Sequence, residues 1–207
     1  MRLLLTILLI TASYTFAFAQ HIKINKEQLL FLKNEDSIQV IFNYEKQERG
    51  GKRISEAKYI DNRKKKIQSK KKDTIVWLKD YKNSKHLLWP KAYISKFNER
   101  LSKYKSPELI INNTTKTNYT MQVNVLWIYS GYEFAGSTSP SKVKLDILLI
   151  NNKTKKIAAT LNIDESRANN SDDDNDSTWP NLRRVENAFA NSGYKLAIAL
   201  KRIFDKN

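Results

Sequence analysis

The residue types that usually carry out catalysis are scarce in this chain. It has two histidines, His21 and His86, and no cysteine, so a cysteine nucleophile and cysteine-bound zinc are excluded. His86 has no carboxylate or nucleophile motif beside it, and no G-x-S-x-G, P-loop or H-E-x-x-H motif occurs. Glu133 and Asp146 could hydrolyse a glycoside as a pair if the fold brought them to the required separation. We therefore expect a protein that is not an enzyme and has no cofactor.

An acidic run resembles the start of a calcium-binding loop. Asp172, Asp174 and Asp176 stand at alternate positions. Ser177 occupies the position where such a loop needs glycine for its turn, and Arg183 occupies the position of the bidentate glutamate. We assign no metal ligand and interpret the run as a solvated loop, which could also fold back on the lysine-rich segment. Calcium binding there is left open.

The densest charge run lies between residues 63 and 72, in Arg63-Lys64-Lys65-Lys66 and Lys70-Lys71-Lys72. The formal net charge is +16, with 28 lysines and 9 arginines. Lysine excess indicates a general affinity for anionic surfaces, because bidentate phosphate or base recognition usually uses arginine. No aromatic residue lies between Asn62 and Ile75, so bases have no stacking platform there and no specific nucleic-acid site is evident. The candidate polyanion-binding residues are Lys64, Lys65, Lys66, Lys70, Lys71 and Lys72; the alternative is a solvated loop.

The second candidate site is the long connection of residues 130–141. It holds Gly131 and Gly136, two of the five glycines in the chain. Long loops on a rigid sheet often carry binding residues. The candidate binding residues here are Tyr132, Glu133 and Phe134, and the alternative is a flexible hairpin end.

Three segments around this connection predict the strands that position it. Apolar residues occupy every second position in each segment, as on a strand with one buried face. We predict a three-stranded antiparallel meander with odd-numbered residues inward, whose second connection, around residues 152–154, must have an odd length. The alternating residues are Tyr119, Met121, Val123, Val125, Trp127 and Tyr129; Val143, Leu145, Ile147 and Leu149; and Ile157, Ala159, Leu161 and Ile163.

The remaining elements are mainly helical. We predict a short helix over 26–33, a strand over 37–44, a helical turn over 55–62, a helix over 73–81 and a short strand over 108–111. In the helix over 73–81, Ile75, Val76 and Leu78 are the expected apolar contacts. Trp89, Tyr93, Phe97 and Leu101 recur every four residues and predict a helix that covers the sheet. A last helix, over 181–204, carries the small residues Ala188, Ser192, Gly193 and Ala197, which would let it approach the sheet closely.

These elements predict an α+β fold in a single domain, with a mostly antiparallel sheet of four to five strands and helices packed on one face. Residues 1–19 have the positive, apolar and small-residue regions of a secretory signal peptide, with cleavage near Ala19-Gln20. The domain would span residues 20–207, with a mainly helical half over 20–105 and the meander and last helix over 106–207. We expect a periplasmic or secreted protein whose mature chain has no transmembrane segment.

The meander followed by Asn191-Ser192-Gly193-Tyr194-Lys195-Leu196-Ala197 resembles small cell-envelope domains. These are the periplasmic domains of penicillin-binding-protein activator lipoproteins and of curli secretion proteins. The front half, with Phe42-Asn43-Tyr44 and Trp89-Pro90, resembles uncharacterised secreted proteins of Bacteroidetes-type bacteria. The activators carry a lipid-anchoring cysteine, which this chain lacks. The resemblance implies an accessory envelope protein that binds another protein; binding of lipopolysaccharide, nucleic acid or another polyanion is the alternative.

Overall fold

The computed structural model describes residues 22, 24–111, 116–134, 137–168 and 182–206. The predicted signal peptide and the run Asp172-Asp173-Asp174-Asn175-Asp176 lie outside these residues. Across the described residues, no helix is long and apolar enough to cross a membrane.

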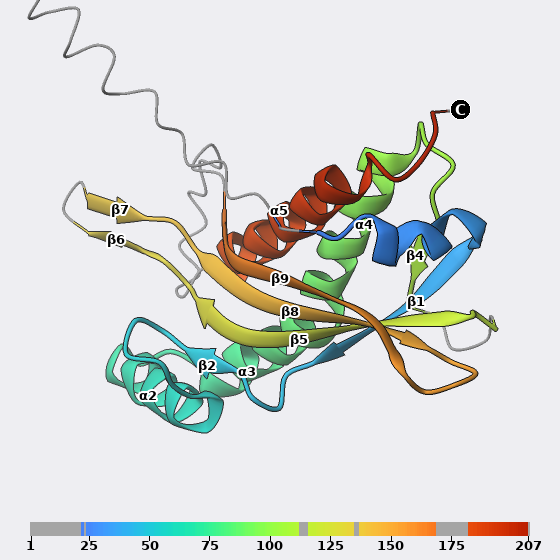
Figure 1. Cartoon of the computed structure of the whole chain (residues 1–207). Helices are drawn as coiled ribbons and strands as arrows, with labels where there is room; N and C mark the ends of the chain where they lie inside the picture. The colour runs from blue at the N-terminus through green and yellow to red at the C-terminus, as the bar shows by residue number, and fades with distance from the viewer. Residues whose placement is uncertain (1–21, 23, 112–115, 135–136, 169–181, 207) are drawn as a thin grey trace, which may run out of the picture.

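The main sheet has seven strands with both parallel and antiparallel pairs (Figure 1). The predicted meander is confirmed, because β5 pairs antiparallel with β8, and β8 with β9. The expectation of a mostly antiparallel sheet of four to five strands is wrong: β1 runs parallel to both β4 and β5, and β2 runs parallel to β5. The strands are β1 (Ser37–Asn43), β2 (Glu48–Arg49), β3 (Ile54–Ser55), β4 (Glu108–Ile110), β5 (Tyr119–Tyr129), β8 (Lys142–Asn151) and β9 (Ile157–Arg167).

The parallel pairs follow from the helices between the first and later strands. The chain leaves β1 and β2, passes through the helical segment and returns as β4 and β5, and such a crossover makes strands parallel. The helices are η1 (Glu27–Asn34), α2 (Glu56–Ser69), α3 (Thr74–Asn83), the π-turn η2 (Ser84–Leu88), α4 (Trp89–Leu101) and α5 (Leu182–Leu200). In Figure 1, α4 and α5 lie side by side and α5 packs on β8 and β9, while α2 and α3 lie near β2.

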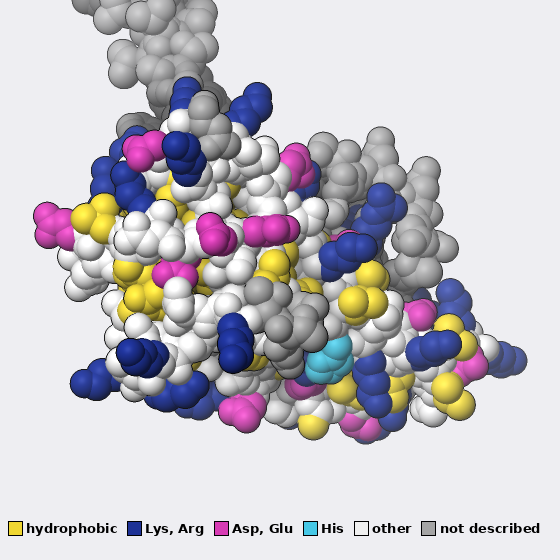
Figure 2. Space-filling model, turned by 90° about the vertical axis from the view of Figure 1, so that its right-hand side faces the viewer, with side chains coloured by type: hydrophobic (Ala, Val, Ile, Leu, Met, Phe, Trp, Pro, Cys, Tyr) yellow, Lys and Arg dark blue, Asp and Glu magenta, His cyan; other side chains and the backbone are white. Residues whose placement is uncertain are grey.

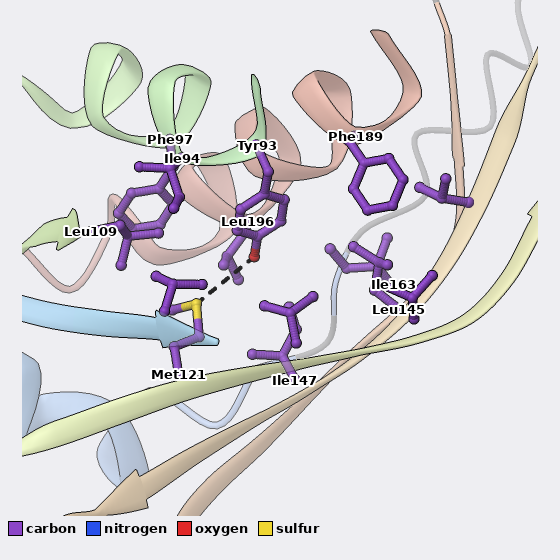
Figure 3. Packing of buried hydrophobic residues seen from close by; sticks show 14 of the residues in the cluster. Tyr93, Ile94, Phe97, Leu109, Met121, Leu145, Ile147, Ile163, Phe189 and Leu196 are labelled. Atoms are coloured by element: carbon purple, nitrogen blue, oxygen red, sulfur yellow. Dashed lines mark hydrogen bonds between the residues drawn. The ribbon is translucent and has the colours of Figure 1, made fainter. Parts of the chain in front are cut away.

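The core lies between the α4–α5 layer and the sheet. Figure 3 shows Tyr93 and Phe97 of α4 and Phe189 and Leu196 of α5 pointing toward strand residues such as Leu145. The aromatic stripe of α4 is buried as predicted. The Tyr93 hydroxyl donates a hydrogen bond to Met121 Sδ at 3.8 Å, within this apolar layer.

The alternation in β5 is interrupted near its end. Met121, Val123 and Val125 are buried as predicted, but a bulge between Val125 and Trp127 shifts the phase by one residue. Ile128 therefore takes the inward position that was predicted for Trp127. Trp127 instead donates from Nε1 to the Gly50 carbonyl at 2.8 Å and stacks on Tyr129.

In β8 and β9, the apolar side chains of Val143, Leu145, Ile147 and Leu149 and of Ala159, Leu161 and Ile163 are buried as predicted. Leu145 pairs with Ile163 and Leu149 with Ala159, as inward odd-numbered residues require. The predicted odd-length connection is nevertheless wrong, because a register shift makes Ile150 pair with Ile157, and the six residues 151–156 lie between this last pair. Ile157 is the exception: it was predicted inward and is exposed, beside a register shift between Leu149 and Ile150.

Gly193 of α5 serves a different contact from the predicted one. A Cβ at Gly193 would overlap the backbone carbonyl oxygen of Tyr93 in α4. Gly193 thus permits close approach of two helices rather than of a helix and a strand. The sequence shows that a close contact is needed, but not which element makes it.

Candidate functional site

The connection of residues 130–141 is a β-hairpin rather than an irregular loop. Its strands β6 (Tyr132–Phe134) and β7 (Ser137–Ser139) pair antiparallel, with Glu133 opposite Thr138. Figure 1 shows this hairpin projecting beyond the α4–α5 layer. Tyr132 is exposed.

The base of the hairpin has a defined geometry. Gly131 has a φ of +71°, and a Cβ there would overlap the backbone carbonyl oxygen of Ser139, so only glycine fits. The Ser141 hydroxyl donates to the Ser130 carbonyl at 2.7 Å. These contacts fix the direction in which the hairpin leaves the sheet.

The lysine run lies partly on a helix. Lys64, Lys65 and Lys66 belong to α2, which extends beyond the predicted helical turn, and Lys70, Lys71 and Lys72 follow its end. Ser55 accepts from the Lys58 amide and begins the helix, while Tyr59 and Ile67 bury its inner face. Lys71 has a φ of +54°, which turns the chain toward α3. Lys64 is half-buried, and the other five lysines are exposed.

Helix α3 exposes two of the three residues that were predicted to be apolar contacts, while the third, Leu78, is partly buried against the core as predicted. Ile75 is 77% exposed and Val76 is 55% exposed, so their prediction as apolar contacts is wrong. Trp77 and Tyr81, one turn apart, are buried and stack with ring centroids 5.4 Å apart. These two large rings determine the inner face of α3 and turn Ile75 and Val76 outward.

A buried arginine lies between the two candidate sites. Arg49 of β2 is fully buried, and its guanidinium lies 4.3 Å from the ring centroid of Tyr59, 5.4 Å from that of Tyr81 and 5.7 Å from that of Trp89. Its Nη2 donates to Ser130 Oγ at 3.5 Å, next to the hairpin. The same guanidinium thus contacts α2 through Tyr59 and the hairpin base through Ser130.

A largely buried ion pair holds α2 on the other side. Lys85 Nζ donates to both carboxylate oxygens of Glu56, at 2.7 and 2.6 Å, and the Tyr81 hydroxyl donates to the same carboxylate at 2.6 Å. The Tyr44 hydroxyl donates to the Lys85 carbonyl at 2.7 Å. The group therefore ties the first turn of α2 to α3, η2 and the segment after β1.

The positive charges in this region help to lower the pKa values of two side chains, Glu56 and Tyr59. Burial alone would raise the pKa of Glu56, but the hydrogen bonds from Lys85 and Tyr81 and the charge of Lys85 outweigh it and lower the pKa. Burial would likewise raise the pKa of Tyr59, but the positive charges of Arg49 and Arg63 lower it below its ordinary value. Both shifts favour the negatively charged form beside the basic side chains.

The sequence offers little signal for this network. Arg49 directly precedes Gly50 and Gly51, so its surroundings predict a turn. Glu56 and Lys85 are 29 residues apart, and nothing in their spacing predicts contact.

The remaining sequence candidates are not brought together. Glu133 pairs with Thr138 in the hairpin, whereas Asp146 pairs with Asn124 in the main sheet. Eight residues separate Thr138 from Asp146, or roughly 26 Å of extended chain. His86 is exposed, and its ring meets the edge of Tyr44. In the described part of the chain, no group of three or more acidic or histidine side chains could hold a metal ion.

A polar pocket of about 580 Å³ lies at the other end of β5, away from the hairpin. It is lined by residues before and in β1, at the start of β5 and in the β8–β9 turn, including Glu35, Tyr119 and Asn152. Asn118 donates to Glu35 and Asn152 donates to the Thr117 carbonyl, so these amides brace the strand ends. None of the predicted binding residues lines the pocket.

Figure 2 shows the molecule turned by 90°, so that the side on the right of Figure 1 faces the viewer. Lysine and arginine side chains occupy several separate places on it, with hydrophobic and uncharged polar groups between them. On this face, the high net charge is therefore dispersed rather than gathered into one block.

No protein-family model and no curated protein matches this chain. The resemblance to cell-envelope domains therefore remains a prediction, and the candidate sites rest on the geometry alone.

Proposed function

We propose that this protein is a non-enzymatic, periplasmic or secreted cell-envelope accessory protein that binds another protein through the β6–β7 hairpin. The observation that carries the proposal is a projecting hairpin with an anchored base. An isolated two-stranded hairpin is marginally stable by itself, and a partner would supply the missing contacts. The location rests on the predicted signal peptide of residues 1–19.

The mode of binding follows from the strand edges. A two-stranded hairpin has outer edges with unpaired N–H and C=O groups, to which an extended segment of a partner can add as a further strand. Tyr132 adds an exposed aromatic side chain, of a type that is enriched at interfaces. Anchoring through Ser130, Gly131 and Ser141 lowers the cost of ordering the hairpin on binding.

The test is capture of an envelope protein on the immobilised chain of residues 20–207. The proposal requires a defined protein to be recovered, and recovery to be lost in the double variant Tyr132→Ala/Phe134→Ala. Leu30→Ala is the matched control, because Leu30 is also exposed but lies on η1. Recovery of no defined protein, or equal recovery by the double variant, would contradict the proposal.

The second candidate function is polyanion binding by the lysine run. Five of its six lysines are exposed, and among the described residues Lys65 alone of the six forms an ion pair, with Asp61 at 2.9 Å. Retention on heparin resin should fall steeply with salt, because lysine–phosphate or lysine–sulfate contacts release counterions. Charge reversal at Lys64, Lys65, Lys71 and Lys72 should abolish retention, and unchanged retention would exclude the run.

A further inference from the structure

The exposed apolar pair Ile75 and Val76 is held outward by the fold. Of the exposed large hydrophobic side chains in the described residues, Ile75 has the highest exposed fraction. Asp73 caps α3 by accepting from the Ile75 amide at 2.6 Å, so the first turn is fixed. Trp77 and Tyr81 occupy the inner face. Adjacent, rigidly presented apolar residues of this kind often mark a contact surface.

Basic residues flank the pair in the sequence. Residues 63–82 contain nine basic and two acidic residues, a net charge of +7. Lys70, Lys71 and Lys72 precede the pair, and Lys79 and Lys82 follow Ile75 by four and seven residues, on the same stripe of α3. All five lysines are exposed. One acidic residue of the segment, Asp73, caps the helix, and the other, Asp80, lies on the outer side of α3.

We propose that this surface docks on a phospholipid bilayer with anionic headgroups. Ile75 and Val76 would enter the boundary between headgroups and acyl chains, and the flanking lysines would contact lipid phosphates. The proposal rests on the second candidate function and specifies the partner of the lysine run.

The apolar pair distinguishes a bilayer from a nucleic acid. A phosphodiester backbone offers nothing to two aliphatic side chains, whereas a bilayer removes both from water. Base stacking requires exposed aromatic rings, and Trp77 and Tyr81 are buried. A bilayer also tolerates lysine in place of arginine, because attraction to anionic lipid does not depend on a planar, bidentate geometry.

The experiment is co-sedimentation of the chain of residues 20–207 with vesicles of phosphatidylcholine, with and without phosphatidylglycerol, alongside heparin retention. Wild type should bind the anionic vesicles and not the neutral ones. Ile75→Ser/Val76→Ser should weaken vesicle binding roughly tenfold and leave heparin retention unchanged. Lys70→Gln/Lys71→Gln/Lys72→Gln should weaken vesicle binding by about a hundredfold and reduce heparin retention. Leu30→Ser, an exposed change on η1, is the control and should bind as wild type does.

Three results would overturn the proposal. Equal vesicle binding by wild type and Ile75→Ser/Val76→Ser would remove the apolar pair from the contact. Heparin retention without vesicle binding would leave polyanion binding standing and exclude the bilayer. Binding of wild type to neither would exclude both polyanion binding and membrane docking. Thermal melts of all variants establish that each is folded.

Discussion

The guanidinium of Arg49 lies 4.3 Å from the ring centroid of Tyr59, joining a strand of two residues to the helix that carries the first part of the lysine run. Both side chains are buried, and both contact Ser130 at the base of the projecting hairpin. The two candidate binding surfaces therefore share one buried support. A substitution in that support should affect both surfaces.

Arg49→Ala should lower the free energy of unfolding by roughly 2–4 kcal/mol, through the cavity and the loss of cation–π contacts. Arg53→Ala is the matched control: Arg53 also lies over an aromatic ring, Trp127, but its side chain is 59% exposed. Its effect should stay within about 0.5 kcal/mol. Urea denaturation measures the free energy of unfolding of both variants. Equal losses of stability would contradict a special role for Arg49.

Glu56 should make stability depend on pH in the acid range. Its pKa is lowered in the folded protein, so the unfolded state binds more protons and stability falls as pH drops through the folded pKa. The stability that ionised Glu56 contributes is fully present above the pKa of glutamate in the unfolded chain, which is about 4.3. Glu56→Gln should therefore be less stable than wild type at pH 7, and the difference should shrink below about pH 4.

Urea midpoints between pH 3 and 7 test this expectation. Glu165, whose pKa is also lowered, is present in both proteins and cancels in the comparison. Glu99→Gln is the control, because Glu99 pairs with Lys96 at an exposed site. A constant difference between wild type and Glu56→Gln across the range would contradict the assignment.

Gly193→Ala should destabilise the protein by about 1–3 kcal/mol. Alanine is the better helix former by about 1 kcal/mol, but its Cβ would overlap the Tyr93 carbonyl, and backbone cannot move aside as a side chain can. Gly51→Ala, where a Cβ meets nothing within 4 Å, should change the melting temperature little. A more stable Gly193→Ala variant would show that α4 and α5 can separate without loss.

Asn98 should contribute to the stability of the fold by holding the edge strand β4. Its side-chain amide accepts from the Leu109 N–H at 2.9 Å and donates to the Leu109 carbonyl at 3.0 Å, as a neighbouring strand would. Asn98→Ala leaves both backbone groups without that partner and should cost roughly 1–3 kcal/mol. Asn98→Asp keeps the acceptor but sets a carboxylate oxygen against the Leu109 carbonyl, so it should cost at least as much; a smaller loss than that of Asn98→Ala in chemical denaturation would refute this order.

The regular elements were predictable where burial follows one period. Trp89, Tyr93, Phe97 and Leu101 are all buried because a helix repeats its inner face about every four residues. The prediction failed at Trp127 because one extra residue in β5 reverses the phase. It failed at Ile75 and Val76 because the larger rings of Trp77 and Tyr81 took the inner face.

The candidate binding surfaces were predictable from composition, as a glycine-containing connection and a lysine run. The buried support that the two surfaces share was not predictable from the sequence. Arg49 is followed by two glycines, so its local sequence predicts a turn, although Tyr59, Tyr81 and Trp89 enclose it. The side chains that enclose the arginine lie up to 40 residues away in the sequence. The residues next to it therefore show no periodic pattern that would predict its burial.

The amino-acid sequence by itself determined the meander, the buried stripe of α4 and the positions of the two candidate surfaces, because alternation, helical spacing and charge runs are local properties. Only the tertiary structure decided that β1 runs parallel to β5, that Gly193 meets Tyr93, and that Arg49 and the Glu56–Lys85 pair are buried. These depend on which distant segments meet. A buried charge is stable only where partners from several elements converge, and that convergence exists only in the folded chain.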